Sequence, residues 1–234
     1  MPYHFLLIET ATEVCSVALS CNEKIVSSIY LERGYSHTEN LFPFIEKILI
    51  NGKITIKEID AVVLSIGPGS YTGLRIGASA AKGICYGLNI PLIAISTLQN
   101  IALGVINKQV IEEKAWVCPM IDARRMEVFT ASFNNKGDAI SEVESKIIDE
   151  HSFKLELENN IIYFCGNGME KCKSILQHKN ARFIDAPLEA SNMLFPALKK
   201  YENRQFEDVA YFEPFYFKEY IAKKTVVKGL YQRL

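Results

Sequence analysis

The sequence has little net charge and no long apolar run. Its 26 lysines and arginines against 27 aspartates and glutamates give a formal net charge of −1. General electrostatic attraction to nucleic acid is therefore missing, and an RNA contact would need a local patch or a partner. No apolar stretch approaches the roughly 20 residues that span a bilayer, and the run Phe5–Ile8 lacks the basic flank of a signal peptide. We expect a cytoplasmic protein with no membrane contact.

Spacings of cysteine and histidine that bind a metal ion are also missing. The six cysteines form no C-x-x-C pair, and several lie in apolar runs, which is typical of buried thiols in a reducing compartment. The four histidines have no partner at metal-ligand spacing, and no combination of Ser, His and Asp with nucleophile geometry can be recognised. We therefore expect no metal and no catalytic residues.

What the sequence does contain is α/β patterning. Apolar runs and helical spacing of apolar residues predict strands and helices in alternation. Two capping-box patterns, Ser36–Glu39 and Thr55–Glu58, mark helix starts. In this first part we predict strands at 5–10, 15–21, 24–31, 61–65 and 92–95, and helices at 36–50, 73–87 and 98–106.

A charged segment without periodicity, 108–115, predicts a division of the chain near residue 105. We expect one subdomain over 1–105 and a second over 106–234. In the second we predict strands at 117–121, 127–133 and 161–165, helices from Gly168 to about Leu176 and from Pro187 to Tyr201, and a basic tail from Lys218.

The two parts share a pattern. Ile8–Thr10 and Met120–Ala123 each end a strand with an acidic residue, followed by a polar turn and a second strand. Each part later has a strand, a glycine turn and a helix. The repetition predicts a duplicated α/β unit in which Glu9, Asp122 and both glycine turns surround one central cleft. The two carboxylates could bind Mg²⁺ or act as acid and base, or each could simply cap its turn.

The most distinctive stretch is the glycine-rich turn Ser65–Gly77. A strand enters it and a small-residue helix leaves it, so backbone N–H groups point at whatever lies above the turn. Gly67, Gly69, Thr72 and Arg75 are therefore candidates for contacting a phosphate. The Lys-Ser/Thr pair of a P-loop is missing, and the glycines could equally serve to reverse the chain.

Within the following helix, Gly73, Gly77 and Ala81 recur every four residues and form one ridge. An interior glycine costs a helix roughly 0.5–1 kcal/mol relative to alanine, so the ridge predicts a closely approaching neighbour. That neighbour is either the protein's own sheet or a helix of another subunit. His37, at the start of the preceding helix, is more typical of a surface residue than of a catalyst. That helix has an apolar stripe broad enough for two contacts, at Leu41, Phe44, Ile45, Ile48 and Leu49.

Several segments resemble the TsaB (YeaZ) family: Ile8–Leu19, His37–Pro43, Gly67–Gly77, Ile121–Arg124 and, near the end, Pro214–Tyr216. The resemblance is specific over residues 5–130 and loose afterwards. It implies a duplicated actin/hexokinase-like α/β fold (the ASKHA, ribonuclease H-like class) with two subdomains around a cleft. It also implies a non-catalytic protein of bacterial tRNA threonylcarbamoyladenosine synthesis, acting at adenosine 37, rather than an enzyme.

In this family two helices form a four-helix bundle with the catalytic paralogue TsaD, or with a second copy when the subunit is alone. The resemblance further implies that a TsaE-like ATPase joins the pair, that tRNA is bound through the complex, and that ATP or ADP binds at most weakly at a subunit boundary. The implied partner-interface residues are His37, Leu41, Phe44, Ile45, Ile48, Gly73, Ile76, Gly77, Ala80 and Ala81. The implied remnants of a nucleotide site are Glu9, Thr10, Gly67, Gly69, Thr72, Arg75 and Asp122.

Two departures from the superfamily weaken an enzymatic role. The catalytic paralogue carries an H-x-x-x-H metal pair where this chain has Thr97 and Ile101, and an isoleucine cannot ligate iron or zinc. The usual first-strand Asp is Glu9 here. Two alternatives stay open: an independent nucleotide-binding ATPase or kinase of the same fold and, less favoured, a peptidase. The basic side chains of the tail are candidates for a tRNA contact or a solvated tail: Lys218, Lys223, Lys224, Lys228 and Arg233.

Overall fold

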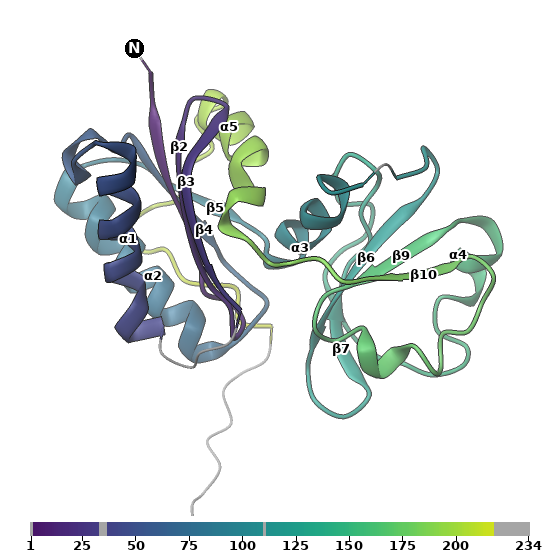
Figure 1. Ribbon diagram of the computed structural model, residues 1–234. Coiled ribbons are helices and arrows are strands. Elements are labelled where there is room, and N and C mark those ends of the chain that lie inside the picture. Colours follow the sequence, from purple (N-terminus) through teal and green to yellow (C-terminus); the bar gives the residue numbers. More distant parts are fainter. Residues whose placement is uncertain (1, 33–36, 110, 218–234) are drawn as a thin grey trace, which may run out of the picture.

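The computed structural model describes residues 2–32, 37–109 and 111–217. Two halves lie side by side, each built on a five-stranded sheet (Figure 1). The first sheet has the order β3-β2-β1-β4-β5 and the second the order β10-β9-β6-β7-β8. In each sheet the central strand has an antiparallel neighbour on one side and a parallel neighbour on the other. The repeated arrangement confirms the duplicated α/β fold that the sequence predicts.

Helices cover both faces of the first sheet and bury its strands, apart from the exposed edge strand β3. Leu6 and Ile8 pack with α1 (His37–Gly52) and α2 (Tyr71–Leu88), whereas Phe5 and Leu7 pack with α5 (Leu194–Glu202). Figure 1 shows α1 and α2 on one side of the sheet and α5 on the other. The strands are β1 (His4–Glu9), β2 (Cys15–Cys21), β3 (Lys24–Leu31), β4 (Ala61–Ser65) and β5 (Leu92–Ile95).

The second sheet is covered on one face by α3 (Thr97–Ile106), whose Leu98, Ile101 and Val105 pack with Val117 of the sheet. A separate apolar cluster includes Leu157 of the short helix α4 (Lys154–Asn159) and Phe164. The strands are β6 (Trp116–Asp122), β7 (Glu127–Thr130), β8 (Glu144–Ile147), β9 (Ile162–Cys165) and β10 (Ala181–Ile184).

Two helices pack into a different half from the one that the order of the sequence suggests. Helix α3 precedes residue 107 but packs into the core of the second sheet. Helix α5 follows the second sheet but packs on the first. The structure therefore differs from the predicted division at residue 105, because the second sheet is inserted between two helices that tie the halves together.

Four predicted strands have exactly the observed bounds, and they are β2, β3, β4 and β5. The predicted helix from Gly168 is wrong, since only a 3₁₀ turn, Glu170–Cys172, forms there. The predicted helix from Pro187 begins later, with a 3₁₀ turn at Ala190–Met193 followed by α5. The predicted strand 127–133 ends at Thr130. The capping box at Thr55 opens the 3₁₀ turn Ile56–Glu58.

Ser36 and the basic tail from Lys218 lie outside the described residues. None of the helices within the described ranges is long and apolar enough to cross a bilayer.

Candidate functional site

The glycine turn is closed by the β1–β2 connection and by the start of α3. Ser70 N donates to Ala11 O at 2.6 Å, and Gly67 N donates to Thr97 Oγ1 at 2.9 Å. A methyl carbon added to Gly69 would lie 2.1 Å from Ala11 O. These N–H groups, which a phosphate would need, are already bonded to protein oxygens. The turn is therefore a junction between the β1–β2 connection and α2, not an open phosphate cradle.

The ridge of small residues on α2 faces the protein's own sheet. A methyl carbon added to Gly73 would lie 2.0 Å from Thr10 O, and one added to Gly77 would lie 2.3 Å from Thr10 Oγ1. Ala81 is completely buried. The sequence left two possible neighbours for this ridge, and in the structure the neighbour is the protein's own sheet. The prediction that this ridge meets another subunit is corrected, because no room for a second helix exists above Thr10.

Most of the other predicted interface residues are also interior. His37 is buried at the start of α1, where its Nε2 lies 2.8 Å from Thr12 O and fixes the helix to the β1–β2 connection. Leu41, Ile45, Ile48 and Ala80 are buried in the core beneath α1 and α2. Phe44 and Ile76 are half-buried at the edge of that core. Only these two of the predicted set are open to solvent.

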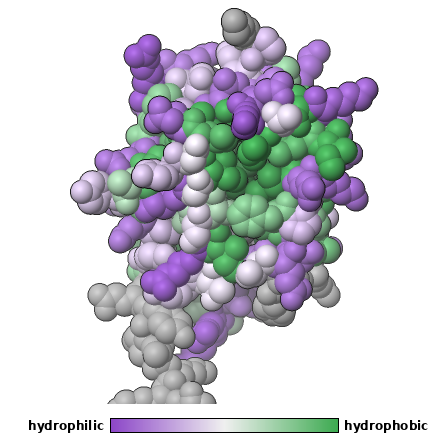
Figure 2. Space-filling view, turned by 90° about the vertical axis from the view of Figure 1, so that its left-hand side faces the viewer, coloured by the Kyte–Doolittle hydropathy of each residue, from purple (hydrophilic) through white to green (hydrophobic). Residues whose placement is uncertain are grey.

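The most exposed apolar side chains of these helices lie outside the predicted stripe. Phe42 and Ile50 of α1 are 57% and 67% exposed, and Tyr86 of α2 is 85% exposed. Figure 2 shows a continuous apolar area on this side of the molecule. We give the name helix-pair face to the apolar and aromatic side chains of these two helices that are at least partly exposed: Phe42, Phe44 and Ile50 of α1 with Ile76, Ile84 and Tyr86 of α2. A signal for part of it was present, since Ile50 is an apolar residue on the side of α1 that faces away from the buried Leu41 and Ile45.

Arg75 lies at the exposed start of α2 in a fixed position. Its guanidinium carbon lies 4.0 Å from the centre of the Tyr71 ring, and its Nε donates to Tyr216 Oη at 3.3 Å. The hydrogen bond from Arg75 to Tyr216 is the main cause that raises the pKa of the guanidinium. Thr72 is exposed beside it. These two predicted anion contacts therefore lie on the outside of α2 rather than in a cleft.

Glu9 is completely buried at the end of β1. Its Oε1 accepts from Ala11 N at 2.7 Å and its Oε2 accepts from Asn100 Nδ2 at 2.6 Å. Burial raises the pKa of Glu9 to about 7, against the opposing effect of hydrogen bonds from Ser65, Ala11 and Asn100. Because both oxygens face protein groups, this carboxyl has no path to a metal ion in the cleft.

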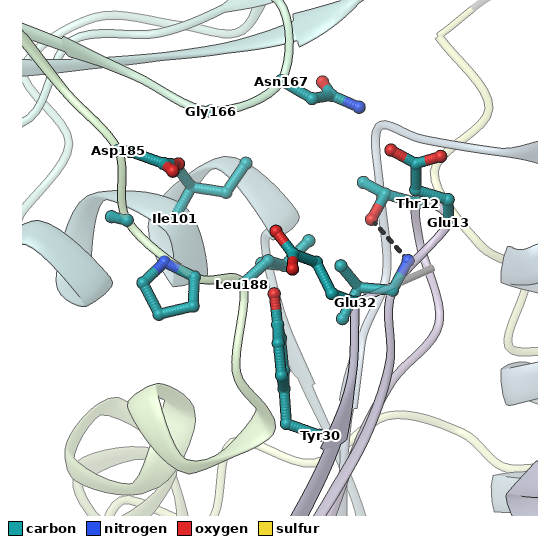
Figure 3. Close-up of a pocket in the computed structure, with 12 residues that line it drawn as sticks. Thr12, Glu13, Tyr30, Glu32, Ile101, Gly166, Asn167, Asp185 and Leu188 are labelled. Carbon is teal, nitrogen blue, oxygen red and sulfur yellow. Dashed lines mark hydrogen bonds between the residues drawn. The ribbon is translucent and has the colours of Figure 1, made fainter. Parts of the chain in front are cut away.

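A cavity of about 170 Å³ lies between the halves, and its walls are acidic (Figure 3). Glu13 and Glu32 approach it from the first half and Asp185 from the second, with Asn167 of the second glycine turn beside them. Burial, followed by the charges of Glu32, Glu189, Asp185 and Glu13, raises the pKa of Tyr30 to about 12. Neither Glu9 nor the first glycine turn lines this cavity, which corrects the predicted cleft.

Asp122, the predicted partner of Glu9, is held within the second half. It forms an ion pair with Lys171, and its backbone N–H donates to Asn167 Oδ1 at 3.0 Å. Partial burial opposes ionisation, but the bonds from Lys171 and Arg124 N outweigh it and lower the pKa of Asp122. Within the described residues, no group of three His, Cys, Asp or Glu side chains could hold a metal ion.

The duplicated α/β fold, with one five-stranded mixed sheet in each half, places the protein in the actin/hexokinase-like class. The family model for TsaD, the tRNA N6-adenosine threonylcarbamoyltransferase, matches residues 32–229. The chain belongs to this family and, within it, to the TsaB (YeaZ) family.

Two named relatives show the level of similarity. The chain is 36% identical over 135 residues to the tRNA threonylcarbamoyladenosine biosynthesis protein TsaB of Escherichia coli (strain K12), which covers 58% of this chain and 57% of that protein. It is 38% identical over 125 residues to TsaB of Haemophilus influenzae. This match covers 53% of this chain and 51% of that protein. The chain thus spans about half the length of the curated relatives it matches.

Solved structures agree with the fold. YeaZ from Pseudomonas aeruginosa superposes with a TM-score of 0.77 at 22% identity, covering 92% of this chain and 99% of that one. Component A of the (R)-2-hydroxyglutaryl-CoA dehydratase of Acidaminococcus fermentans superposes with a TM-score of 0.51 at 11% identity. The match covers 87% of this chain and 99% of that one. These likenesses concern the fold alone.

The residues of this chain do not fit a magnesium-bound nucleotide in the cleft. The first-strand carboxyl is buried in the core, and the N–H groups of Gly67, Ser70 and Gly73 are bonded to protein oxygens. The acidic side chains of the cavity walls carry the same sign of charge as a phosphate. The cavity is also smaller than the roughly 300–1,000 Å³ of most ligand pockets.

We therefore predict that calorimetric titration of the isolated chain with Mg-ATP gives no saturable heat, meaning a dissociation constant weaker than about 1 mM. Tight binding that disappears in Gly69→Val would instead support the nucleotide-dependent alternative.

Proposed function

We propose that the protein is a non-catalytic subunit in bacterial synthesis of threonylcarbamoyladenosine at adenosine 37 of tRNA, and that it binds a TsaD-like catalytic paralogue through the helix-pair face. Its setting is the cytoplasm, with a TsaE-like ATPase and tRNA reached through the complex. The names of its relatives support the pathway. The exposed apolar area over α1 and α2 is the observation that supports the binding role.

The chemistry of this face favours a protein partner. Contiguous exposed apolar surface is uncommon on monomers and marks interaction sites, and aromatic side chains such as Phe42 and Tyr86 are typical anchors of interfaces. The polar pair Arg75–Tyr216 beside it supplies fixed hydrogen-bonding groups at its rim. When the paralogue is absent, the same face of a second copy satisfies the same requirement, which gives a homodimer.

Thr97 and Ile101, at the positions that hold a metal in the catalytic paralogue, have structural roles in this chain. Thr97 is completely buried, and its Oγ1 lies 2.8 Å from Ser65 Oγ while accepting from Gly67 N. Ile101 belongs to the apolar core of the second half. A subunit with these residues contributes surface and shape to a complex, while the chemistry belongs to the partner.

The test is an exposed-residue variant. We predict that Phe42→Asp weakens binding to the purified catalytic paralogue by at least about 30-fold, because a buried charge at an interface anchor costs 2 kcal/mol or more. The midpoint of thermal unfolding should stay unchanged, since Phe42 contacts little of its own core. Phe195→Asp is the matched control, because Phe195 is 62% exposed on α5, across the sheet.

Calorimetry or surface-based binding measures both variants against the wild type. Normal binding by Phe42→Asp and Tyr86→Asp would contradict the proposed face, and loss of binding by Phe195→Asp would move the interface to the opposite side of the sheet. Substitutions at buried positions such as Ile45 and Gly77 cannot test this face, because Ile45→Asp or Gly77→Leu would disrupt the core of the protein itself.

A further inference from the structure

Arg75 is a cation that its own half holds in one position beside the helix-pair face. Its guanidinium carbon lies 4.0 Å from the centre of the Tyr71 ring and 5.9 Å from that of the Tyr216 ring. The two ring centres are 5.0 Å apart, and Tyr216 Oη accepts a hydrogen bond from Arg75 Nε at 3.3 Å. Two rings and one hydrogen bond therefore orient the guanidinium before any partner arrives.

The other hydrogen-bond donors of this guanidinium are still available. A guanidinium carries several N–H groups in a planar fork, and the bond from Nε to Tyr216 uses one of them. Within the described residues, no carboxylate lies at ion-pair distance from Arg75. Glu213 lines the same groove as Arg75 without forming such a pair. The terminal nitrogens of the fork thus remain open to an acceptor from outside.

The side chain lies on the same side of α2 as part of the helix-pair face. Four residues of α2 recur at alternating spacings of four and three, which places them on one side of the helix: Arg75, Ser79, Lys82 and Tyr86. Tyr86 belongs to the helix-pair face and is 85% exposed. Arg75 is also exposed, and the rise of an α-helix places it roughly 16 Å from Tyr86. A partner that covers Tyr86 with a patch of about 800 Å², roughly 30 Å across, therefore reaches Arg75.

The charge along this side of α2 selects the chemistry of the partner. Arg75 and Lys82 are the charged residues of α2, and the helix contains no acidic residue. Lys82 is already engaged, because its Nζ donates to Ala210 O and to Phe212 O, both at 3.0 Å. The oriented guanidinium is therefore the group on this side of α2 that can bind an anion of the partner.

One oriented guanidinium fits a carboxylate better than a phosphate. Its planar fork matches the two oxygens of one carboxylate in a bidentate pair. A phosphate presents more acceptor oxygens and is usually bound by several donors. The described residues that line the groove beside Arg75, of about 720 Å³, supply no second free cation and include Glu213. The N–H groups of Gly67 and Ser70 in the turn before α2 are bonded to protein oxygens as well.

We propose that Arg75 binds an aspartate or glutamate side chain of the catalytic paralogue and so determines which surface of the partner docks on the helix-pair face. This role of Arg75 rests on the proposed function and adds the chemistry of the partner's contact. Because Tyr71 and Tyr216 already orient the guanidinium, little side-chain freedom is lost when the pair forms. A surface without a carboxylate at this place leaves the cation covered and unpaired, which disfavours wrong partners.

Arg75→Gln removes the charge and the fork while keeping a polar side chain. We expect it to weaken binding to the purified catalytic paralogue at least about 10-fold. The affinity of the wild type should fall more steeply than that of the variant between about 50 mM and about 500 mM salt, because salt screens a charge pair at the rim of an interface. An unchanged affinity, or an unchanged salt dependence, overturns the proposal.

Phe42→Asp, measured in the same titrations, separates failure of this contact from failure of the proposed function. If Phe42→Asp loses binding and Arg75→Gln does not, the helix-pair face stands and the carboxylate contact is wrong. If both variants bind as the wild type does, the helix-pair face itself is wrong. If Arg75→Gln binds the paralogue normally but lowers the affinity of the assembled pair for tRNA, the ligand is a phosphate, which also overturns the carboxylate contact.

A cross-link identifies the acceptor. Arg75→Lys places a primary amine near the position of the guanidinium. A carbodiimide activates a carboxylate, and an amine in direct contact with that carboxylate then forms an amide bond while the carbodiimide leaves as a urea. With the paralogue at a concentration that saturates the variant, mass spectrometry should find a peptide pair that joins position 75 to an aspartate or glutamate of the paralogue.

Arg204→Lys is the matched control for the cross-link. Arg204 is exposed just after α5, which covers the opposite face of the first sheet. The amine introduced by Arg204→Lys should therefore give no peptide pair with the paralogue. A cross-link from position 75 to Glu213 alone, or no cross-link from position 75, overturns the proposal.

Discussion

Gly73→Ala should destabilise the protein by about 3 kcal/mol, although alanine is the better helix former. The added methyl carbon would lie 2.0 Å from Thr10 O, a backbone atom at the end of the central strand. Thr10 Oγ1 also donates to Gly73 O at 2.8 Å, so the helix and the strand cannot separate without breaking a buried hydrogen bond. A loss of this size is a large part of the roughly 5–15 kcal/mol that stabilises a typical domain.

Gly83→Ala in the same helix is the matched control. Nothing lies within 4 Å of a methyl carbon at Gly83, so the substitution should stabilise the protein by roughly 0.5–1 kcal/mol through helix propensity. Urea unfolding of the two variants should therefore give free-energy changes of opposite sign. If Gly73→Ala leaves the free energy of unfolding unchanged but abolishes binding to the catalytic paralogue, then Gly73 belongs to the interface after all.

A chain cut at residue 105 should not fold, although the sequence predicts a subdomain boundary there. The cut removes Met193, Leu194 and Leu198, which cover one face of the first sheet. Each of these side chains contributes about 1.5–3 kcal/mol when fully buried. Their sum approaches the whole stability of a domain, and the cut also exposes the apolar side of α3, including Leu98 and Ile101.

Circular dichroism and urea unfolding of residues 1–105 should show no cooperative transition. The control is the same fragment joined through a flexible linker to residues 188–217, which restores the cover of the first sheet and should recover a cooperative transition. A cooperative transition in the shorter fragment would contradict the role assigned to α5.

The sequence was most informative where one physical signal decided the outcome. Strands such as β4 and β5 are short, continuously apolar and fully buried, so their limits follow from hydrophobicity alone. Strands β8 and β10 are partly exposed sheet edges without an apolar pattern, and they were not predicted. The segment after Gly168 has helical spacing of apolar residues, but the structure forms only the 3₁₀ turn Glu170–Cys172 there.

The candidate site shows a second limit of prediction from the sequence. The ridge at Gly73 and Gly77 correctly predicted a close neighbour, but periodicity describes one helix and says nothing of what lies opposite. Only the parallel pairing of β1 with β4 places Thr10 under this ridge. The same holds for Glu9, whose burial depends on α3, an element about 90 residues further along the chain.

The return of α5 to the first sheet has a consequence for synthesis. A chain made from its N-terminus produces β1 to β5 early, but the helix that covers their second face is made only after all ten strands. Until then Phe5, Leu7 and Ile93 lie on an uncovered apolar face, a surface that favours aggregation or chaperone binding. Completion of the first half therefore waits for nearly the whole chain to leave the ribosome, and the inserted second sheet must fold first or wait with it.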